Sequence, residues 1–125
     1  GITMHPHPYT PLLQELKSKV ENQTNTVFTS VLLNLYRNGK DSNGWHADNE
    51  KELGHNPVIA SVSLGAERNF QLRHNTDQSQ KLNLVLKNGS LLLMKGSTQH
   101  FWKHQIPKTA KPVNPRINLT FRTIL

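Results

Sequence analysis

Residues 34–50 read N-L-Y-R-N-G-K-D-S-N-G-W-H-A-D-N-E, a polar segment that begins at the end of an apolar run. The apolar run, Val27–Tyr36, has the composition of a β-strand. In extended chain after the polar turn, His46 and Asp48 project from the same side of the backbone, because side-chain direction alternates. An imidazole nitrogen and a carboxylate oxygen can then reach one small cation. Since His-x-Asp is also common in solvated turns, this interpretation depends on a further ligand.

A second histidine would complete the two-histidine, one-carboxylate set that leaves open positions on a non-haem Fe(II) ion. His5 and His7 are each followed by proline, and we interpret them as loop residues. The other histidines that could serve are His55, His74, His100 and His104. His100 and His104 lie shortly before the final strand, and spacing alone allows either. For every histidine, a surface or capping role is the more common alternative.

Length and composition set limits on the class of protein. A chain of 125 residues has the size of one domain, and the lack of cysteine excludes disulfides, thiolate ligands and a cysteine nucleophile. No apolar run is long enough to span a membrane, and no signal-peptide pattern opens the sequence. We therefore expect a cytoplasmic protein without membrane association, and we expect a monomer.

The net charge of +7 is concentrated in the second part of the chain. Residues 1–50 contain four Lys or Arg and five Asp or Glu, whereas residues 51–125 contain eleven and three. A basic half of this kind is typical of proteins that bind a polyanion, most often nucleic acid. A solubilising surface would explain the same charge.

The apolar pattern predicts one helix followed by strands. Thr10-Pro11 is a typical helix start, and apolar residues between Leu12 and Val20 form one face of a helix ending near Asn22. The predicted strands are Val27–Tyr36, Val58–Leu64, Asn69–Arg73, Lys81–Lys87, Ser90–Met94 and Arg116–Ile124. Asn88-Gly89 predicts a hairpin between the fourth and fifth of these strands. Many short strands after one helix indicate a sandwich or jelly roll, with the helix packed on a sheet.

The last predicted strand has one polar and one apolar face. The polar face carries Arg116, Asn118, Thr120 and Arg122, and the apolar face carries Ile117, Leu119 and Phe121. In a half-exposed strand the polar face would meet water. Two arginines in one row also suit a dicarboxylate, because a guanidinium binds a carboxylate bidentately. Asn34 and Tyr36 likewise share a face just before the His-x-Asp motif, which suggests the lining of a pocket.

In this order, N-x-Y, H-x-D, a distal histidine and R-x-N-x-T-x-R resemble the AlkB family of Fe(II)- and 2-oxoglutarate-dependent nucleic-acid dealkylating dioxygenases. The segments P-V-I-A-S-V-S-L-G-A-E-R-N-F-Q-L-R-H and R-I-N-L-T-F-R are similar to members that repair methylated bases in DNA. The resemblance covers nearly the whole chain. It implies a mainly β fold, a double-stranded β-helix (jelly roll) with a helix near the N-terminus packed on the sheet, and a single catalytic core over residues 1–125.

The resemblance also implies roles for individual residues. The iron ligands at the catalytic centre would be His46, Asp48 and His104. The residues that hold the co-substrate 2-oxoglutarate would be Asn34, Tyr36, Arg116, Asn118, Thr120 and Arg122. Within that set, Arg116 with Tyr36 would take the distal carboxylate, and Arg122 would lie near the metal-chelating end. Glu50 and Arg73 fall near positions at which the family contacts its substrate base.

The implied activity is oxidative demethylation of bases such as 1-methyladenine and 3-methylcytosine in DNA, and the resemblance leaves RNA open as a further substrate. It uses Fe(II), O2 and 2-oxoglutarate and releases succinate, CO2 and formaldehyde. Compared with the family, the sequence begins near the last part of a segment that supplies extra strands and a flexible lid, so we expect an N-terminally short catalytic core. Two other functions stay open: a 2-oxoglutarate oxygenase acting on a protein or small molecule, and a catalytically idle nucleic-acid-binding fragment.

Overall fold

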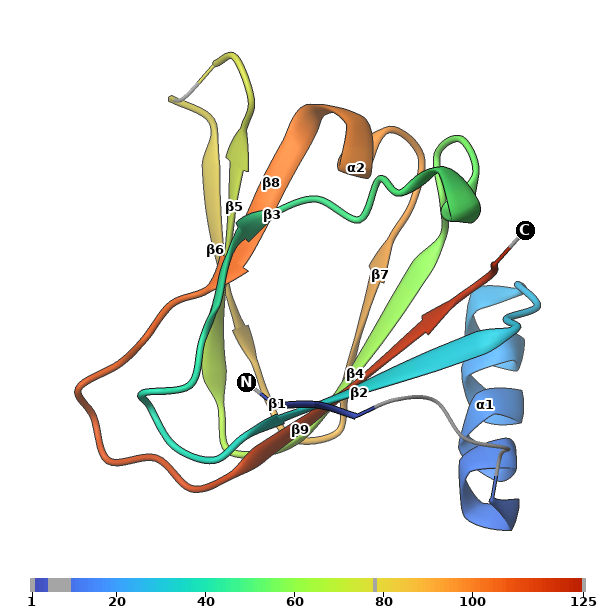
Figure 1. Ribbon diagram of the computed structural model, residues 1–125, viewed down its shortest axis with the longest axis horizontal. Coiled ribbons are helices and arrows are strands. Elements are labelled where there is room, and N and C mark those ends of the chain that lie inside the picture. Colours follow the sequence, from blue (N-terminus) through green and yellow to red (C-terminus); the bar gives the residue numbers. More distant parts are fainter. Residues whose placement is uncertain (1, 5–9, 78, 125) are drawn as a thin grey trace.

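The computed structural model describes residues 2–4, 10–77 and 79–124, which form two antiparallel β-sheets and a long helix (Figure 1). The five-stranded sheet has the order β1-β2-β9-β4-β7, and the four-stranded sheet has the order β3-β8-β5-β6. The strands are β1 (Ile2–Met4), β2 (Ser30–Tyr36), β3 (Asn43–His46), β4 (Ile59–Gly65), β5 (Arg68–His74), β6 (Lys81–Leu86), β7 (Ser90–Met94), β8 (Trp102–Ile106) and β9 (Arg116–Arg122). The predicted mainly β fold is therefore confirmed.

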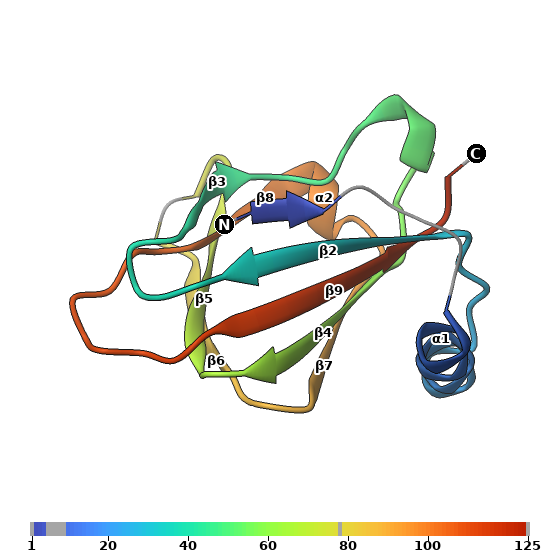
Figure 2. The same cartoon turned by 60° about the horizontal axis from the view of Figure 1, so that its bottom comes forward.

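The long helix α1 (Pro11–Thr24) begins and ends on local signals in the sequence. Thr10 caps it, because its hydroxyl accepts the Leu13 backbone N–H at 3.2 Å, and proline occupies the first turn. Asn25 ends it in the left-handed conformation, with φ 51°. The apolar face of α1 packs on the five-stranded sheet, on the side away from the four-stranded sheet (Figures 1 and 2).

The buried residues form two clusters, one on each side of the five-stranded sheet. Between α1 and the sheet lie Val20, Phe28, Val31, Ala60, Val62, Leu119 and Phe121. Between the two sheets lie Tyr36, Leu53, Ile59, Phe70, Leu72, Leu86, Met94 and Ile106. The apolar face of β9 thus packs under the helix, and its polar face is directed between the sheets. On this polar face Arg116 is 2% exposed and Asn118 is 7% exposed, whereas Thr120 and Arg122 are partly buried.

Three strands were not predicted from the sequence. Residues 2–4, for which no strand was predicted, pair with β2 as strand β1, whereas His5 and His7, which were interpreted as loop residues, lie outside the described residues. β3 was missed because it contains an Asn-Gly pair, which is typical of a turn. β8 was missed because a histidine occupies one of its inward-facing positions, where a strand pattern normally has an apolar residue. β3 and β8 pair with each other, so each is stabilised by a contact distant in sequence. Two short helical turns, η1 (Lys51–Leu53) and α2 (Thr98–Phe101), complete the elements.

The hairpin predicted at Asn88-Gly89 is wrong. β6 pairs with β5, but β7 pairs with β4 in the other sheet, so the turn carries the chain between sheets. Asn88 Oδ1 accepts the Gly65 N–H at 2.9 Å, and the Gly89 N–H donates to the Ser63 carbonyl at 2.7 Å. Gly89 has φ +78°, a conformation that favours glycine. The turn signal is real, but a local signal cannot specify which sheet the next strand joins.

Among the described residues, no helix is long and apolar enough to cross a membrane.

Candidate metal centre and its pocket

A cavity of about 360 Å³ lies between the two sheets. Its apolar lining includes Leu32, Phe70, Leu86, Met94 and Ile106. Its polar lining is made of Asn34, Tyr36, Ser42, Asn43, His46, Asp48, Glu50, Ser61, His104, Arg116, Asn118, Thr120 and Arg122. A cavity of this size with convergent polar groups has the properties of a small-molecule site.

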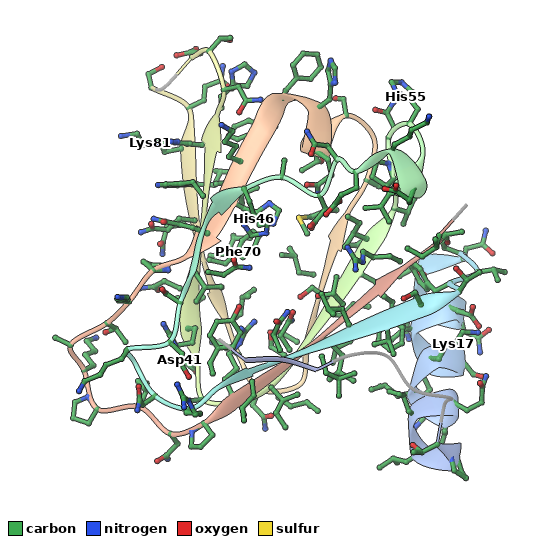
Figure 3. The ribbon with its side chains drawn as sticks, in the orientation of Figure 1. Lys17, Asp41, His46, His55, Phe70 and Lys81 are labelled. Carbon is green, nitrogen blue, oxygen red and sulfur yellow. The ribbon has the colours of Figure 1, made fainter. Side chains whose placement is uncertain are left out.

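Three metal-ligand side chains converge at this cavity. Ligand atoms of His46, Asp48 and His104 all lie within 4.8 Å of one another. The Asp48 carboxylate is 4.0 Å from His46 Nε2 and 3.7 Å from His104 Nε2. Figure 3 shows His46 beside Phe70 in the space between the sheets, whereas His55 lies on a distant loop. Two imidazoles and one carboxylate form the donor set expected for a non-haem Fe(II) ion.

Strand register brings the two histidines together. His46 is the last residue of β3, and it stands opposite His104 of β8 in the antiparallel ladder. Side chains opposite each other in a ladder point to the same face of the sheet. The two rings are accordingly 4.3 Å apart between centroids. Asp48, two residues after His46, reaches the same point from the chain that leaves β3.

The histidines are oriented by different neighbours. His46 Nδ1 lies 2.6 Å from the Gly44 carbonyl oxygen, so Nδ1 carries the proton and Nε2 is left as the ligand atom. The His104 ring stacks on Phe70 with 5.1 Å between centroids and 27° between planes. His104 Nδ1 is buried and has no hydrogen-bond partner among the described residues.

Burial of His104, with a smaller contribution from His46, lowers the pKa of His104 to about 4. His104 is only 4% exposed. Its imidazole is therefore neutral near pH 7, the form in which histidine binds a metal ion.

The metal-free protein should lose stability on acidification from pH 6.5 toward pH 4. Over this range the unfolded chain takes up a proton on His104 that the folded chain does not, so the free energy of unfolding falls as the pH falls. From the pKa difference, the loss is about 3 kcal/mol. Urea unfolding with chelator present measures it, and His104→Leu supplies the comparison. An equally steep pH dependence in that variant would contradict the assignment to His104.

A polar wall on β2 and β9 faces the metal-ligand cluster across the cavity. Asn34 stands opposite Asn118, and Tyr36 stands opposite Arg116. Arg116 Nη2 donates to Ser63 Oγ at 2.9 Å, and the guanidinium carbon is 4.9 Å from the centre of the Tyr36 ring. Burial raises the pKa of Tyr36 and lowers that of Arg116. Both side chains are thus shielded from bulk water.

The arginines of this wall have unsatisfied donors. Within the described part of the chain, no acidic side chain pairs with Arg116, and its Nε and Nη1 atoms are buried without a hydrogen-bond partner. Arg122 Nε is buried and unpartnered in the same way. A buried charge without a counter-ion is costly, typically by several kcal/mol. The wall therefore suits an anionic ligand with more than one carboxylate oxygen.

Asn118 and Thr120 contact other residues of the protein. The Asn118 amide nitrogen donates to Ser61 Oγ at 2.6 Å and to the Val62 carbonyl at 3.1 Å. Its oxygen accepts the Thr120 hydroxyl at 2.8 Å. These bonds fix the polar face of β9 to β4. Ser61 and Ser63 were not among the predicted site residues, although their alternation within V-I-A-S-V-S-L is the same period-2 signal that marks Asn34 and Tyr36.

Arg68, also missed from the sequence, supports Tyr36 from another side. It is 4% exposed, and its guanidinium carbon lies 5.6 Å from the centre of the Tyr36 ring. It donates to the carbonyl oxygens of Asp41 at 2.9 Å and Pro107 at 2.7 Å. Arg68 therefore fastens two loops to the sheet. No short-range pattern in the sequence indicates these partners.

The two residues expected to contact the base are in different places. Glu50 is exposed and lines the cavity. Arg73 is not among the lining residues, and its guanidinium carbon lies 4.4 Å from the centre of the Trp45 ring.

Of the other described histidines, His74 Nδ1 accepts the Asp77 N–H at 3.0 Å, and His100 packs edge-on against Phe101. They do not join the metal-ligand cluster, and His104 is the histidine that does.

Comparison with known proteins places this geometry in a family. Residues 2–122 match the 2OG-Fe(II) oxygenase superfamily. Over 132 aligned residues the chain is 46% identical to human alpha-ketoglutarate-dependent dioxygenase alkB homolog 3, covering 98% of this chain and 46% of the relative. It is 40% identical to human DNA oxidative demethylase ALKBH2, covering 100% of this chain and 51% of the relative. The predicted resemblance to AlkB proteins is confirmed.

A relative in Arabidopsis thaliana, also named DNA oxidative demethylase ALKBH2, is 39% identical and covers 94% of this chain and 44% of the relative. The chain therefore spans about half the length of the curated relatives it matches. The solved structure of OsALKBH1 superposes with a TM-score of 0.60 over 90% of this chain and 60% of that one, at 20% identity, which supports the shared fold. With its match over residues 2–122, the chain belongs to the 2OG-Fe(II) oxygenase superfamily.

Proposed function

We propose that this chain oxidatively demethylates N-alkylated bases in DNA, with His46, Asp48 and His104 as ligands of Fe(II). One observation carries the proposal: a two-histidine, one-carboxylate cluster shares a cavity with buried guanidinium donors that have no protein partner. The family uses Fe(II), 2-oxoglutarate and O2. Relatives named DNA oxidative demethylase, which match this chain over its full length, support DNA as the substrate.

The residues that line the cavity fit both Fe(II) and 2-oxoglutarate. The neutral His104 and the Nδ1-protonated His46 each offer an Nε2 lone pair, and Asp48 supplies a negative charge. Arg116 with Tyr36 would bind the distal carboxylate of 2-oxoglutarate, and Arg122 would bind near its metal-chelating end. Asn34 adds a polar group to the same wall. Because the Asn118 amide bonds to β4, we assign to Asn118 and Thr120 the role of holding this wall in place.

When bound, Fe(II) and 2-oxoglutarate would supply the oxidation with O2: one oxygen atom enters succinate as CO2 leaves, and the other hydroxylates the N-methyl group, which is released as formaldehyde. The protein side chains orient the reactants. Glu50 at the cavity would attract a methylated base such as 1-methyladenine or 3-methylcytosine, each of which carries a positive charge. The base must be single-stranded or flipped out of a duplex to reach the cavity.

An assay with a methylated oligonucleotide tests the proposal. We expect iron-dependent release of succinate and formaldehyde in amounts equal to the repaired base. Succinate formed without repaired base, together with activity on a protein or small molecule, would favour the alternative oxygenase. Oligonucleotide binding that is unchanged by chelator and 2-oxoglutarate, without turnover, would favour the idle binding fragment. Parallel reactions on methylated RNA would test whether RNA is also a substrate.

Salt should weaken oligonucleotide binding. Lys103, Arg73 and Lys81 occupy one register across three neighbouring strands, and Figure 3 shows Lys81 pointing away from the space between the sheets. If this row contacts three phosphates of a single strand, the slope of log K against log salt is about −2. Between 50 and 200 mM salt, the affinity would then fall about 20-fold. Lys103→Ala should reduce the slope by about 0.7. Binding that is insensitive to salt would exclude this electrostatic contact.

A further inference from the structure

Gln99 contacts two residues that line the cavity, Asp48 and Met94. It lies in the short helix α2 and is 2% exposed. Its Oε1 accepts the Asp48 backbone N–H at 2.8 Å, across 51 residues of sequence. Its Nε2 lies 3.4 Å from Met94 Sδ, at the end of β7. A backbone N–H can bond only to the amide oxygen, so this contact fixes which way the Gln99 amide faces.

Asp48 has little other support for its backbone. β3 ends at His46, and residues 47–50 have no regular secondary structure. The ladder that holds His46 opposite His104 therefore does not extend to Asp48. Since a change in the backbone of Asp48 would move its carboxylate, the Gln99 contact is well placed to determine where that carboxylate lies.

Gln99 also lies close in sequence to the distal histidine. α2 leads directly into β8, which carries His104 five residues after Gln99. The Gln99 side chain thus links the segment that carries Asp48 to α2, the helix that immediately precedes the strand of His104. The simpler alternative is a buried glutamine that only fills space and satisfies its own polar groups. If Gln99 positions Asp48, loss of the oxygen acceptor weakens metal binding beyond its effect on the free energy of unfolding. If Gln99 only fills space, the loss lowers stability and leaves metal affinity unchanged.

We propose that Gln99 is a positioning residue for the metal centre, holding the backbone of Asp48 so that its carboxylate meets His46 and His104. The inference rests on the proposed function, because it takes Asp48 as a metal ligand. Partners of this kind, which orient a ligand without touching the metal, typically change metal affinity 10- to 100-fold when removed.

The test compares Co(II) affinity, measured by calorimetric titration of the whole chain, with the free energy of unfolding. Gln99→Met keeps the size of the side chain and removes the acceptor, and we expect Co(II) binding about 10- to 100-fold weaker. Thr98→Val is the matched control. It removes the neighbouring hydrogen bond to the Lys95 carbonyl in the same turn and should leave Co(II) affinity unchanged. Hydrogen exchange at the Asp48 amide should become faster in Gln99→Met and stay slow in Thr98→Val.

Gln99→Glu is a second variant that retains an oxygen in the accepting position. It should bind Co(II) more tightly than Gln99→Met does, and no more weakly than the wild type. If Gln99→Met does not fold, a folded Gln99→Glu that binds Co(II) tenfold more weakly would overturn the proposal. Gln99→Met that binds as tightly as the wild type would overturn it as well. Failure of the proposed function gives a different result, because the wild type would then show no Co(II) binding that depends on Asp48.

Discussion

Asp48→Ala should abolish iron-dependent turnover while the domain stays folded. Asp48 provides the only carboxylate within the described metal-ligand cluster. Structural zinc sites in zinc-finger peptides bind their metal with about 10–16 kcal/mol through four ligands, or roughly 3 kcal/mol for each ligand, which sets the scale for one lost ligand. Loss of one ligand from three should therefore weaken metal affinity at least ~100-fold. Succinate release at fixed iron concentration and Co(II) titration together measure this effect.

The fold should survive because the two histidines that remain need no counter-ion when they are neutral. His104 is neutral near pH 7, since its pKa is lowered to about 4. Asp77→Ala is a suitable control, because Asp77 is an exposed carboxylate that bonds to Ser79 and Gln80 outside the cavity. The metal affinity of the Asp77→Ala variant should match that of the wild type. Full turnover in Asp48→Ala would rule out Asp48 as a ligand, and the same test applies to His46→Ala.

Residues that follow a local period could be predicted from the sequence. Side chains two apart on a strand share a face, so the pairing of His46 with Asp48, and of Arg116 with Arg122, needed no tertiary information. The structure adds that the polar face of β9 lines the cavity and that Leu119 and Phe121 on its apolar face pack under α1. The strand pattern alone allowed either orientation.

Contacts between distant segments could not be predicted in this way. The choice of His104 over His100 depends on the β3–β8 register, which the pattern left open before the family resemblance was considered. Gln99 reaches across 51 residues to Asp48, and nothing in its neighbouring sequence marks it. The error at Asn88-Gly89 has the same origin. A turn dictates the local chain direction, whereas the partners of β6 and β7 depend on packing of the whole domain.

Arg116→Met should weaken co-substrate binding without lowering the stability of the ligand-free protein. In the ligand-free protein, Arg116 is 2% exposed and has two unpartnered donor atoms, and no carboxylate of the described chain pairs with it. Replacing such a buried charge with an apolar side chain of similar length should leave the free energy of unfolding unchanged or raise it by about 1 kcal/mol. Binding of 2-oxoglutarate should weaken at least ~30-fold, because loss of one partner from a buried charge pair costs about 2 kcal/mol or more.

Calorimetric titration of the Co(II)-loaded protein with 2-oxoglutarate and urea unfolding of the ligand-free protein measure the two effects. Arg37→Met is the matched control, because Arg37 is a surface arginine paired with Asp41, and 2-oxoglutarate affinity should not change. Arg122→Ala should also weaken 2-oxoglutarate binding, but less than Arg116→Met does, because Arg122 is less buried. If Arg116→Met destabilised the fold and left 2-oxoglutarate affinity intact, Arg116 would be a structural residue. A buried guanidinium that costs stability without ligand is instead expected of a site built for a dicarboxylate.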